Sequence, residues 1–234
     1  MSARDHICRL LPALVTAWLA GGCALIDASG QGGGDGDDIA TDCRPIISNS
    51  FDNSALWGEY AEPGTLIQRA PDALQITAAP DEEDFSAYAH LRSNAQQVIG
   101  QTRLEAMMAP AAEGSVAGIS WTQDDPAIDE DQNYYDLVVD FGTLIAAHRE
   151  PYGEHQVVCS ECPPYDPGEH AWFRLRADSG EVFYEVSPDG SDWSAIASAP
   201  QNDGVYHSIA FVYAAAPDTS ALSITGMEWS DCQP

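Results

Sequence analysis

The chain has 234 residues, of which 37 are acidic, 9 are arginine and none is lysine, and its formal net charge is −28. A surface this negative repels phosphate backbones and anionic lipid headgroups, which excludes nucleic-acid binding and membrane attachment through a basic patch. Cations, basic partners and neutral sugars remain compatible with the charge. Hydrophobic residues make up 44% of the chain, which is enough for a sizeable core in one all-β domain or two small ones.

Residues 1–22 have the layout of an export signal. Arg4 and Arg9 give a positive start, and the apolar stretch that follows is too short to span a bilayer as a helix. The run Leu19-Ala-Gly-Gly-Cys23 resembles a bacterial lipoprotein signal, which implies a signal peptide over residues 1–22 and a lipid on Cys23. The alternative is an ordinary secretory signal that is cleaved nearby.

A flexible tether is expected over residues 23–42, because this Gly- and Asp-rich stretch cannot bury apolar surface. The lipoprotein resemblance implies that acyl chains on Cys23 anchor the protein to a membrane of the cell envelope. Ala24 follows Cys23, whereas many lipoproteins kept at the inner membrane have Asp there. The resemblance therefore favours the outer membrane over the inner membrane.

From residue 46 onward, the chain reads as strands separated by Gly, Pro, Asp and Asn clusters, which is typical of a sandwich or barrel. We see no convincing amphipathic helix. The expected strands cover residues 66–69, 74–78, 86–92, 98–108, 115–122, 133–140, 143–149, 155–159, 170–177, 181–187, 192–198, 205–214 and 221–230.

A hairpin over residues 181–193 is the clearest local element. Two strand-like runs flank the turn sequence Pro188-Asp-Gly190. Pro188 presets φ for the first turn position, and Gly190 accepts the positive φ that such a turn needs.

Several motifs resemble the concanavalin A-like jelly-roll domains of the laminin-G-like group. The resemblance covers roughly residues 46–230 and implies an all-β, two-sheet antiparallel jelly roll within a domain over residues 43–234. Because one fold carries many activities, it says little about function. The motifs are Phe51-Asp-Asn, Gly118-Ile-Ser-Trp121, Asn133-Tyr-Tyr-Asp-Leu-Val-Val139, His170-Ala-Trp-Phe-Arg-Leu-Arg-Ala177, Phe183-Tyr-Glu-Val-Ser-Pro-Asp-Gly-Ser-Asp-Trp193 and Ala221-Leu-Ser-Ile-Thr-Gly-Met-Glu-Trp229.

Four cysteines remain after Cys23, and an even number in an exported chain suggests disulfides. Cys43 and Cys232 bracket the folded region, and the first and last strands of sandwiches often lie side by side, so this pair could join the termini. Cys159 and Cys162 would then pair with each other or stay unpaired. The alternative is a zinc site, whose ligands would be His155, Cys159, Cys162 and His170.

The polar faces of the strands at 133–140 and 170–177 are candidates for ligand binding. If they share a sheet, their aromatic rings can stack on sugars and their charged groups can bind hydroxyls. The alternative is cross-strand Arg–Asp pairing that keeps a sheet face soluble. The candidate residues are Tyr134, Asp136, Asp140, Trp172, Arg174 and Arg176.

The sequence contains no recognised catalytic motif. A glycosidase of this fold needs two carboxylates across one sugar ring, and in jelly-roll glucanases these lie on one strand as Glu-x-Asp-x-x-Glu. Asp136 and Asp140 share a strand face, but that run is absent. A Gly-x-Ser-x-Gly elbow and a phosphate-binding Gly loop are absent as well.

An acidic loop within residues 123–132 is a candidate calcium site. Calcium prefers several hard oxygens on a flexible loop, and laminin-G-like domains often hold such an ion at a sheet rim. The alternative is a solvated loop, and we expect no other cofactor. The candidate ligands are Asp124, Asp125, Asp129, Glu130 and Asp131.

Together, these features predict a lipid-anchored envelope protein whose partners are the membrane, through its anchor, and a carbohydrate or protein ligand, but not a nucleic acid. The leading interpretation is a non-catalytic binding module. One alternative is a polysaccharide-active hydrolase or lyase of the same fold. A second alternative is a structural surface protein without a small ligand.

Overall fold

The computed structural model describes residues 42–80, 85–110, 116–123, 133–150, 153–159 and 161–233. The predicted signal peptide, the predicted lipid site Cys23 and the predicted tether lie outside these ranges, except for Asp42, which opens the first strand. Among the described residues, no helix is long and apolar enough to cross a membrane.

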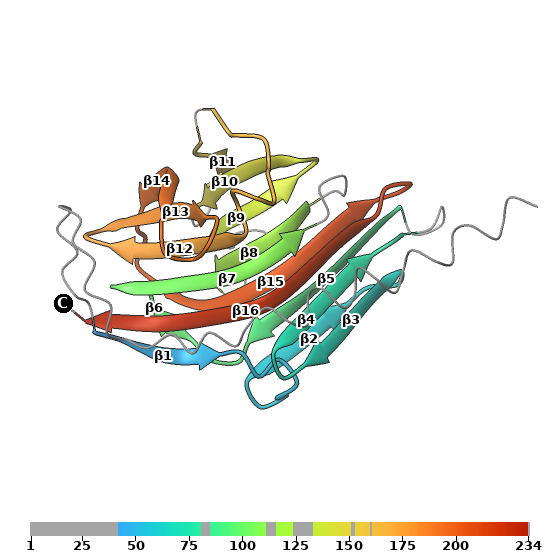
Figure 1. Ribbon diagram of the computed structural model, residues 1–234, viewed down its shortest axis with the longest axis horizontal. Coiled ribbons are helices and arrows are strands. Elements are labelled where there is room, and N and C mark those ends of the chain that lie inside the picture. Colours follow the sequence, from blue (N-terminus) through green and yellow to red (C-terminus); the bar gives the residue numbers. More distant parts are fainter. Residues whose placement is uncertain are drawn as a thin grey trace, which may run out of the picture. The chain divides into compact units, whose positions relative to one another are not determined.

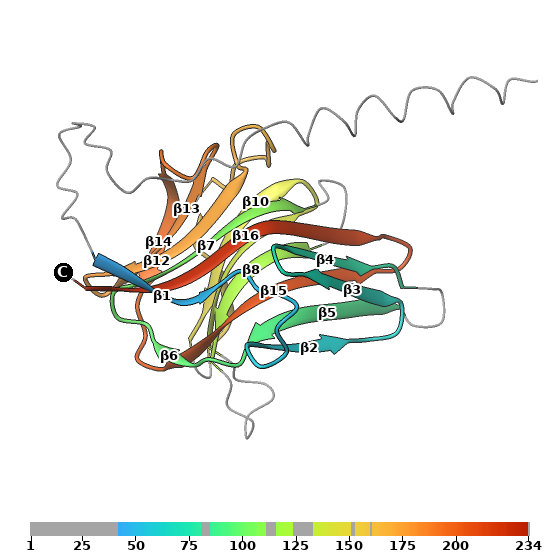
Figure 2. The ribbon, with the colours of Figure 1, turned by 60° about the horizontal axis from the view of Figure 1, so that its bottom comes forward.

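The described elements are β-strands that pack as two layers (Figures 1 and 2). They are β1 (Asp42–Ser48), β2 (Trp57–Ala61), β3 (Thr65–Ala70), β4 (Ala73–Ala78), β5 (Ser86–Ser93), β6 (Gln97–Val98), β7 (Thr102–Pro110), β8 (Val116–Thr122), β9 (Tyr134–Asp140), β10 (Thr143–Arg149), β11 (His155–Val157), β12 (Trp172–Asp178), β13 (Glu181–Ser187), β14 (Ser194–Pro200), β15 (Val205–Ala215) and β16 (Ser220–Gln233).

Two antiparallel sheets form the sandwich, which confirms the expected all-β fold class. Sheet A has the order β14-β13-β12-β7-β16-β4-β3, with β1 also beside β16. Sheet B has the order β11-β10-β9-β8-β15-β5-β2, with β6 also beside β15. Neighbours in each sheet often come from distant parts of the chain, so most of the strand pairing is non-local.

Two strands, β1 and β2, were not expected from the sequence. Neither has a clear alternation of apolar and polar residues, and each is defined by its partner, since β1 pairs with β16 and β2 pairs with β5. The single strand expected over residues 98–108 is wrong as well. The structure divides it into β6, which pairs with β15, and β7, which pairs with β12 and β16.

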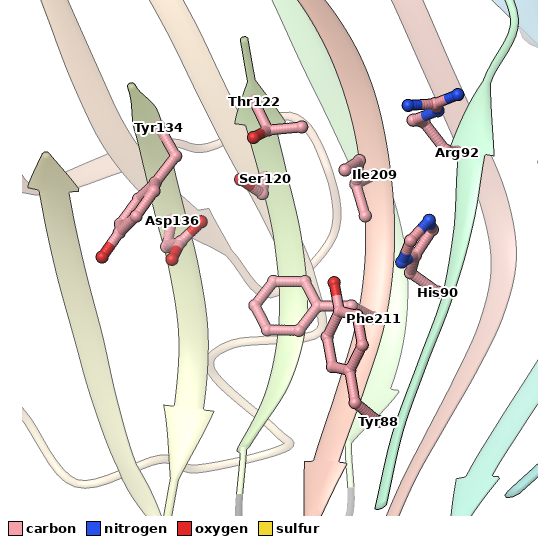
Figure 3. Close-up of a pocket in the computed structure, with 9 residues that line it drawn as sticks. All are labelled: Tyr88, His90, Arg92, Ser120, Thr122, Tyr134, Asp136, Ile209 and Phe211. Atoms are coloured by element: carbon pink, nitrogen blue, oxygen red, sulfur yellow. The ribbon is translucent and has the colours of Figure 1, made fainter. Parts of the chain in front are cut away.

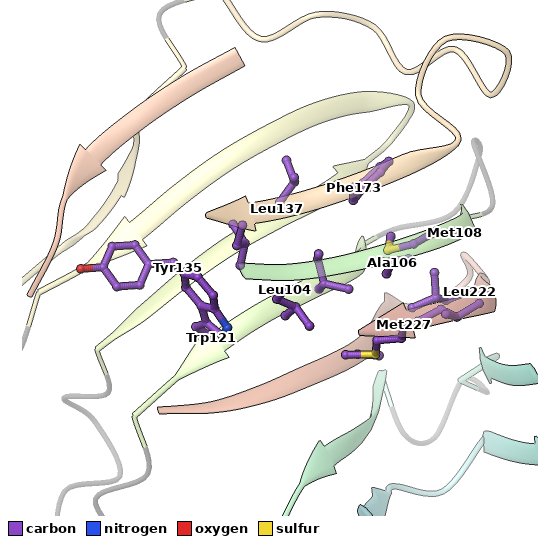
Figure 4. Packing of buried hydrophobic residues seen from close by; sticks show 14 of the residues in the cluster. Leu104, Ala106, Met108, Trp121, Tyr135, Leu137, Phe173, Leu222 and Met227 are labelled. Atoms are coloured by element: carbon purple, nitrogen blue, oxygen red, sulfur yellow. The ribbon is translucent and has the colours of Figure 1, made fainter. Parts of the chain in front are cut away.

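The core lies between the two sheets and is filled by alternate side chains of strands such as β5, β7 and β12, some of which Figure 4 draws. On β12, Phe173 and Leu175 are fully buried, while Arg174 between them is only partly buried. Across the core, Trp121 of β8 and Leu137 of β9 are also fully buried. Burying one such apolar side chain stabilises a fold by about 1.5–3 kcal/mol, so this alternation fixes which face of each strand is left for other uses.

Both predicted disulfides are present. Cys43 and Cys232 are register partners on β1 and β16, so the first and last strands lie side by side. Cys159 and Cys162 are bonded to each other across a three-residue separation. With their sulfurs joined, these two cysteines are not available as zinc thiolates.

The hairpin between β13 and β14 has the predicted turn. Gly190 adopts φ 81°, as the turn sequence requires. The Ser187 hydroxyl accepts hydrogen bonds from the backbone N–H groups of Asp189 and Gly190, at 3.3 and 2.9 Å. These bonds are local to the turn and help to hold its shape.

Removing the Cys43–Cys232 bond should destabilise the domain strongly. The bond closes a loop of 189 residues, for which the chain-entropy model gives about 5 kcal/mol of stability. The double variant Cys43→Ser/Cys232→Ser should lose stability of this order in urea unfolding. The matched control Cys159→Ser/Cys162→Ser should lose only about 2 kcal/mol, and equal losses would contradict the loop-length account.

Candidate functional site

The two polar faces predicted to bind a ligand lie on different sheets. The alternation on each strand is as expected, with Tyr134 and Asp136 on the outer face of β9 and Arg174 on the outer face of β12. However, β9 belongs to sheet B and β12 belongs to sheet A. The predicted combined surface is therefore wrong, because the order of strands in the sheets is not encoded in the local pattern.

The outer face of sheet A is occupied by its own ion pairs. The side chain of Glu185 is 7% exposed and lies between two guanidinium groups, with N···O distances of 2.5 Å to Arg174 and 3.0 Å to Arg176. Arg174 also approaches Glu105, at 3.3 Å. This is the cross-strand charge pairing considered for the sequence, with glutamate in place of aspartate.

Trp172, the third candidate on this face, is covered by the β13–β14 turn. A Cβ on Gly190 would lie only 3.0 Å from the indole ring of Trp172, so the turn rests directly on that ring. The neighbouring Trp193 ring carries the guanidinium of Arg174, whose central carbon is 3.9 Å from the ring centroid. The three candidates on sheet A, Trp172, Arg174 and Arg176, therefore already have partners within the chain.

Truncating Glu185 should destabilise the fold strongly. Glu185→Ala removes the shared buried partner of Arg174 and Arg176, which keep only Glu105 and Asp178, and such a loss costs about 2–3 kcal/mol. The control Asp178→Ala removes a more exposed partner of Arg176 and should cost less than about 1 kcal/mol. Urea unfolding of both variants checks this, and a small loss for Glu185→Ala would contradict a structural role.

The outer face of sheet B carries a pocket of about 370 Å³, which is within the size range of small-ligand sites (Figure 3). Arg92, Ile209, Ser120 and Asp136 stand in one row across β5, β15, β8 and β9. The full lining is Tyr88, His90, Arg92, Ser120, Thr122, Tyr134, Asp136, Ile209 and Phe211.

Aromatic rings form the wall of the pocket on the β5 side. The ring centroids of Tyr88 and Phe211 are 6.2 Å apart, and those of Tyr88 and His90 are 5.4 Å apart. Tyr60 of β2 extends this wall, because its ring stacks on His90 at 5.5 Å and its side chain is 48% exposed. Such rings offer flat apolar surfaces to a ligand.

Asp136 lies opposite this wall and is the single carboxyl group among the described residues that line the pocket. Burial raises the pKa of Asp136 from 3.8 to about 7, against a smaller lowering by a hydrogen bond with Ser120. The carboxyl group is therefore largely protonated in mildly acidic solution. Asp140 shares the strand face but does not line the pocket.

Tyr134 stands beside Asp136 on β9 and is held from the far side by His155 of β11. The distance from the Tyr134 hydroxyl to His155 Nδ1 is 2.6 Å. Burial and then the nearby Asp136 raise the pKa of Tyr134 to about 12, and the cation of Arg149 opposes this shift. Tyr134, Arg149 and His155 form one row across β9, β10 and β11.

Seven lining residues were not among the sequence candidates. A signal for some of them exists, because polar and aromatic residues alternate with Ala and Leu over residues 86–92. What the sequence does not contain is the adjacency of β5, β15, β8 and β9, which brings these residues to one pocket. The missed residues are Tyr88, His90, Arg92, Ser120, Thr122, Ile209 and Phe211.

The predicted calcium ligands lie outside the described residues, so this site stays a prediction. Within the described part of the chain, no three His, Cys, Asp or Glu side chains gather as a group that could hold a metal ion.

Comparisons with known proteins find similar folds but no related sequences. No family model and no curated protein matches the chain. The catalytic domain of an endo-1,3-β-glucanase (laminarinase) from Thermotoga petrophila RKU-1 superposes with a TM-score of 0.59 at 12% identity, over 83% of this chain and 100% of that chain.

Two further solved structures are similar in the same way. The β-glucanase of Bacillus licheniformis has a TM-score of 0.54 at 13% identity, covering 79% of this chain and 97% of its own. LamA from Z. galactanivorans, solved with laminaritriose and laminaritetraose, has a TM-score of 0.56 at 11% identity, covering 80% and 98%. These likenesses support the expected concanavalin A-like jelly-roll fold, while the resemblance to laminin-G-like domains stays a prediction.

The raised pKa of Asp136 should make stability depend on pH. The folded protein holds this proton up to about pH 7, whereas the unfolded chain releases it near pH 3.8. The contribution of the bound proton to the free energy of unfolding is therefore complete below about pH 4 and is lost by about pH 7. Relative to wild type, Asp136→Asn should therefore gain stability as the pH rises from 4 to 8, on the order of 2–4 kcal/mol.

Urea unfolding of both proteins across this pH range measures the effect. The control Asp192→Asn changes an exposed carboxyl group and should follow the wild-type curve. Parallel curves for Asp136→Asn and wild type would contradict a protonated, buried Asp136.

Proposed function

We propose that this protein is a polysaccharide-active hydrolase that binds a neutral glycan in the pocket of sheet B. The observation that carries the proposal is the protonatable carboxyl group of Asp136, set in a pocket with aromatic rings on the opposite wall. This combination supplies both a surface for sugar rings and an acid for the glycosidic oxygen.

Asp136 has the property that a general acid needs. A glycosidic bond breaks more easily when the leaving oxygen receives a proton, and the best donor has a pKa near the working pH. Burial brings the pKa of Asp136 to about 7, while an ordinary aspartate is ionised at that pH and has no proton to give.

The rest of the lining suits a sugar chain. Tyr88 and Phe211 offer ring faces for stacking, and the hydroxyl groups of Ser120 and Thr122 can exchange hydrogen bonds with sugar hydroxyls. The net charge of −28 favours a neutral chain over a polyanion.

The similar structures favour the same class of substrate. Two of them are a laminarinase and a β-glucanase by name, and a third was solved with laminari-oligosaccharides. At 11–13% identity the likeness is one of fold. It makes the enzymatic alternative better supported than the non-catalytic module first expected, and it suggests a β-glucan as the first substrate to test.

The envelope location belongs to this proposal. A lipid on Cys23 and a tether over residues 23–42 would hold the jelly roll at the outer membrane, where an exported polysaccharide-active protein meets its substrate. A structural calcium ion in the acidic loop within residues 123–132 is a further part of the proposal. Mass spectrometry can test the lipid on Cys23, and metal analysis can test the calcium ion.

A second candidate is a glycan-binding module without turnover. It is favoured by one observation, which is that the described lining residues include one carboxyl group, whereas glycosidases of this fold use two.

Sugar-release and binding assays on laminarin and lichenan separate these functions. The wild type should release sugar, with activity falling above about pH 7 as Asp136 ionises. Asp136→Asn should bind the glycan but lose at least about 100-fold in kcat. The control Asp140→Asn, on the same strand face but outside the pocket, should keep its activity.

Three results would speak against the proposal. Activity that survives Asp136→Asn would exclude Asp136 as the acid. Glycan binding without sugar release by the wild type would support the second candidate. If the wild type neither binds these glycans nor releases sugar from them, both functions are contradicted for neutral β-glucans.

A further inference from the structure

The pocket contains one carboxyl group among its described lining residues, yet glycoside hydrolysis uses a second reacting group next to the acid. Tyr88 and His90 stand on β5, three strands from Asp136, which is about 14 Å at the backbone. Tyr134 is two residues from Asp136 on the same strand and face, and both line the pocket (Figure 3). Tyr134 is therefore the best-placed partner for Asp136.

The contacts of Tyr134 are those of an activated nucleophile. Its hydroxyl is 2.6 Å from His155 Nδ1, within the distance at which a general base takes a proton from a nucleophile. The two rings are tilted by 41° with centroids 5.9 Å apart, so the imidazole meets the hydroxyl at its edge. His155 is exposed, which lets it exchange protons with water.

Arg149 stands between Tyr134 and His155 in the row across β9, β10 and β11. Its guanidinium donates to the Gly153 carbonyl at 2.9 Å, which fixes the side chain in place. The cation favours negative charge on the Tyr134 oxygen and so stabilises charge that develops there.

We propose that Tyr134 is a nucleophile of this site and that His155 is the base that accepts its proton. This inference rests on the proposed function for its substrate, but the reactivity of Tyr134 can be measured without any glycan.

In the glycan reaction, the Tyr134 oxygen bonds to the anomeric carbon while the glycosidic bond breaks. The electron pair of that bond goes to the leaving oxygen, which takes the Asp136 proton, and the tyrosyl proton passes to His155. Water then attacks the anomeric carbon, and one of its protons goes to Asp136. The Tyr134 oxygen leaves with the proton from His155, so the net change is the addition of one water.

The base is needed because burial raises the pKa of Tyr134 to about 12, so little free phenolate exists at neutral pH. A hydrogen-bonded base removes this difficulty by taking the proton as the new bond forms. A neutral tyrosine also avoids the repulsion that a second carboxylate would create beside Asp136.

The competing explanation is that the Tyr134–His155 hydrogen bond only ties β11 to the sheet. All three residues of β11 are exposed, and β11 pairs with β10 alone among the described strands. The hydrogen bond could therefore serve only to stabilise this edge strand. A structural bond would not raise the reactivity of the hydroxyl group.

Labelling of the full chain with an aryl sulfonyl fluoride separates these explanations. The tyrosyl oxygen bonds to sulfur, fluoride leaves with the S–F electrons, and His155 takes the proton. Peptide mass mapping should show Tyr134 labelled at least about tenfold faster than Tyr60, which is more exposed but hydrogen-bonds to Glu62. Tyr134→Phe should remove the fast label.

Two histidine variants complete the test. His155→Gln should slow labelling of Tyr134 at least about tenfold, while the control His170→Gln, at a partly exposed histidine whose ring contacts that of Tyr165, should not. Unchanged circular dichroism and urea midpoints show that the variants fold. Equal labelling of Tyr134 and Tyr60, or labelling of Tyr134 that does not change in His155→Gln, would overturn the inference.

The outcomes remain distinct from those for the proposed function. With laminarin, Tyr134→Phe should lower kcat about as far as Asp136→Asn. Sugar release that depends on Asp136 but not on Tyr134 would overturn the nucleophile and leave the proposed function standing. Fast, His155-dependent labelling in a protein that releases no sugar would overturn the proposed function and leave the reactive tyrosine standing.

Discussion

The alternation of inward and outward side chains along strands such as β5, β7 and β12 is the constraint on which the rest of this structure depends. One face of each of these strands is buried against the other sheet, where side chains such as Trp121, Leu137 and Phe173 are fully buried. The other face is then free to differ between the sheets. Sheet A uses it for ion pairs around Glu185, and sheet B uses it for a pocket.

The contrast between the two outer faces explains why one of them is a candidate site. On sheet A, Arg174 and Arg176 share Glu185 and each has a second carboxylate partner, so these charges are paired within the face. On sheet B, Asp136 is half-buried beside rings and hydroxyl groups, and desolvation raises its pKa so that it keeps its proton up to about pH 7. A protonated acid in a lined pocket can act on a ligand, whereas a fully paired face mainly stabilises the sheet.

Much of the fold could be predicted from the sequence, because strand alternation, turn residues and cysteine spacing are local or composition-based signals. The turn at Gly190, the Cys43–Cys232 pair and the inward faces of β9 and β12 are examples. The strands β1 and β2 could not be predicted, because long-range pairing rather than their own pattern defines them.

The candidate site could be predicted only in part, for a related reason. Alternation predicts Tyr134 and Asp136, but it also groups them with Trp172, Arg174 and Arg176, which belong to the other sheet. Which strands lie side by side is decided by packing over the whole chain, and so is the meeting of Phe211 with Tyr88.

The most direct test of the account is an NMR titration of the labelled protein with laminaritetraose, followed through assigned signals. We expect shifts concentrated on the residues that line the pocket of sheet B, including Ser120, Asp136 and Phe211. Shifts centred on Trp172 and Arg174 of sheet A, or no shifts at saturating oligosaccharide, would contradict it.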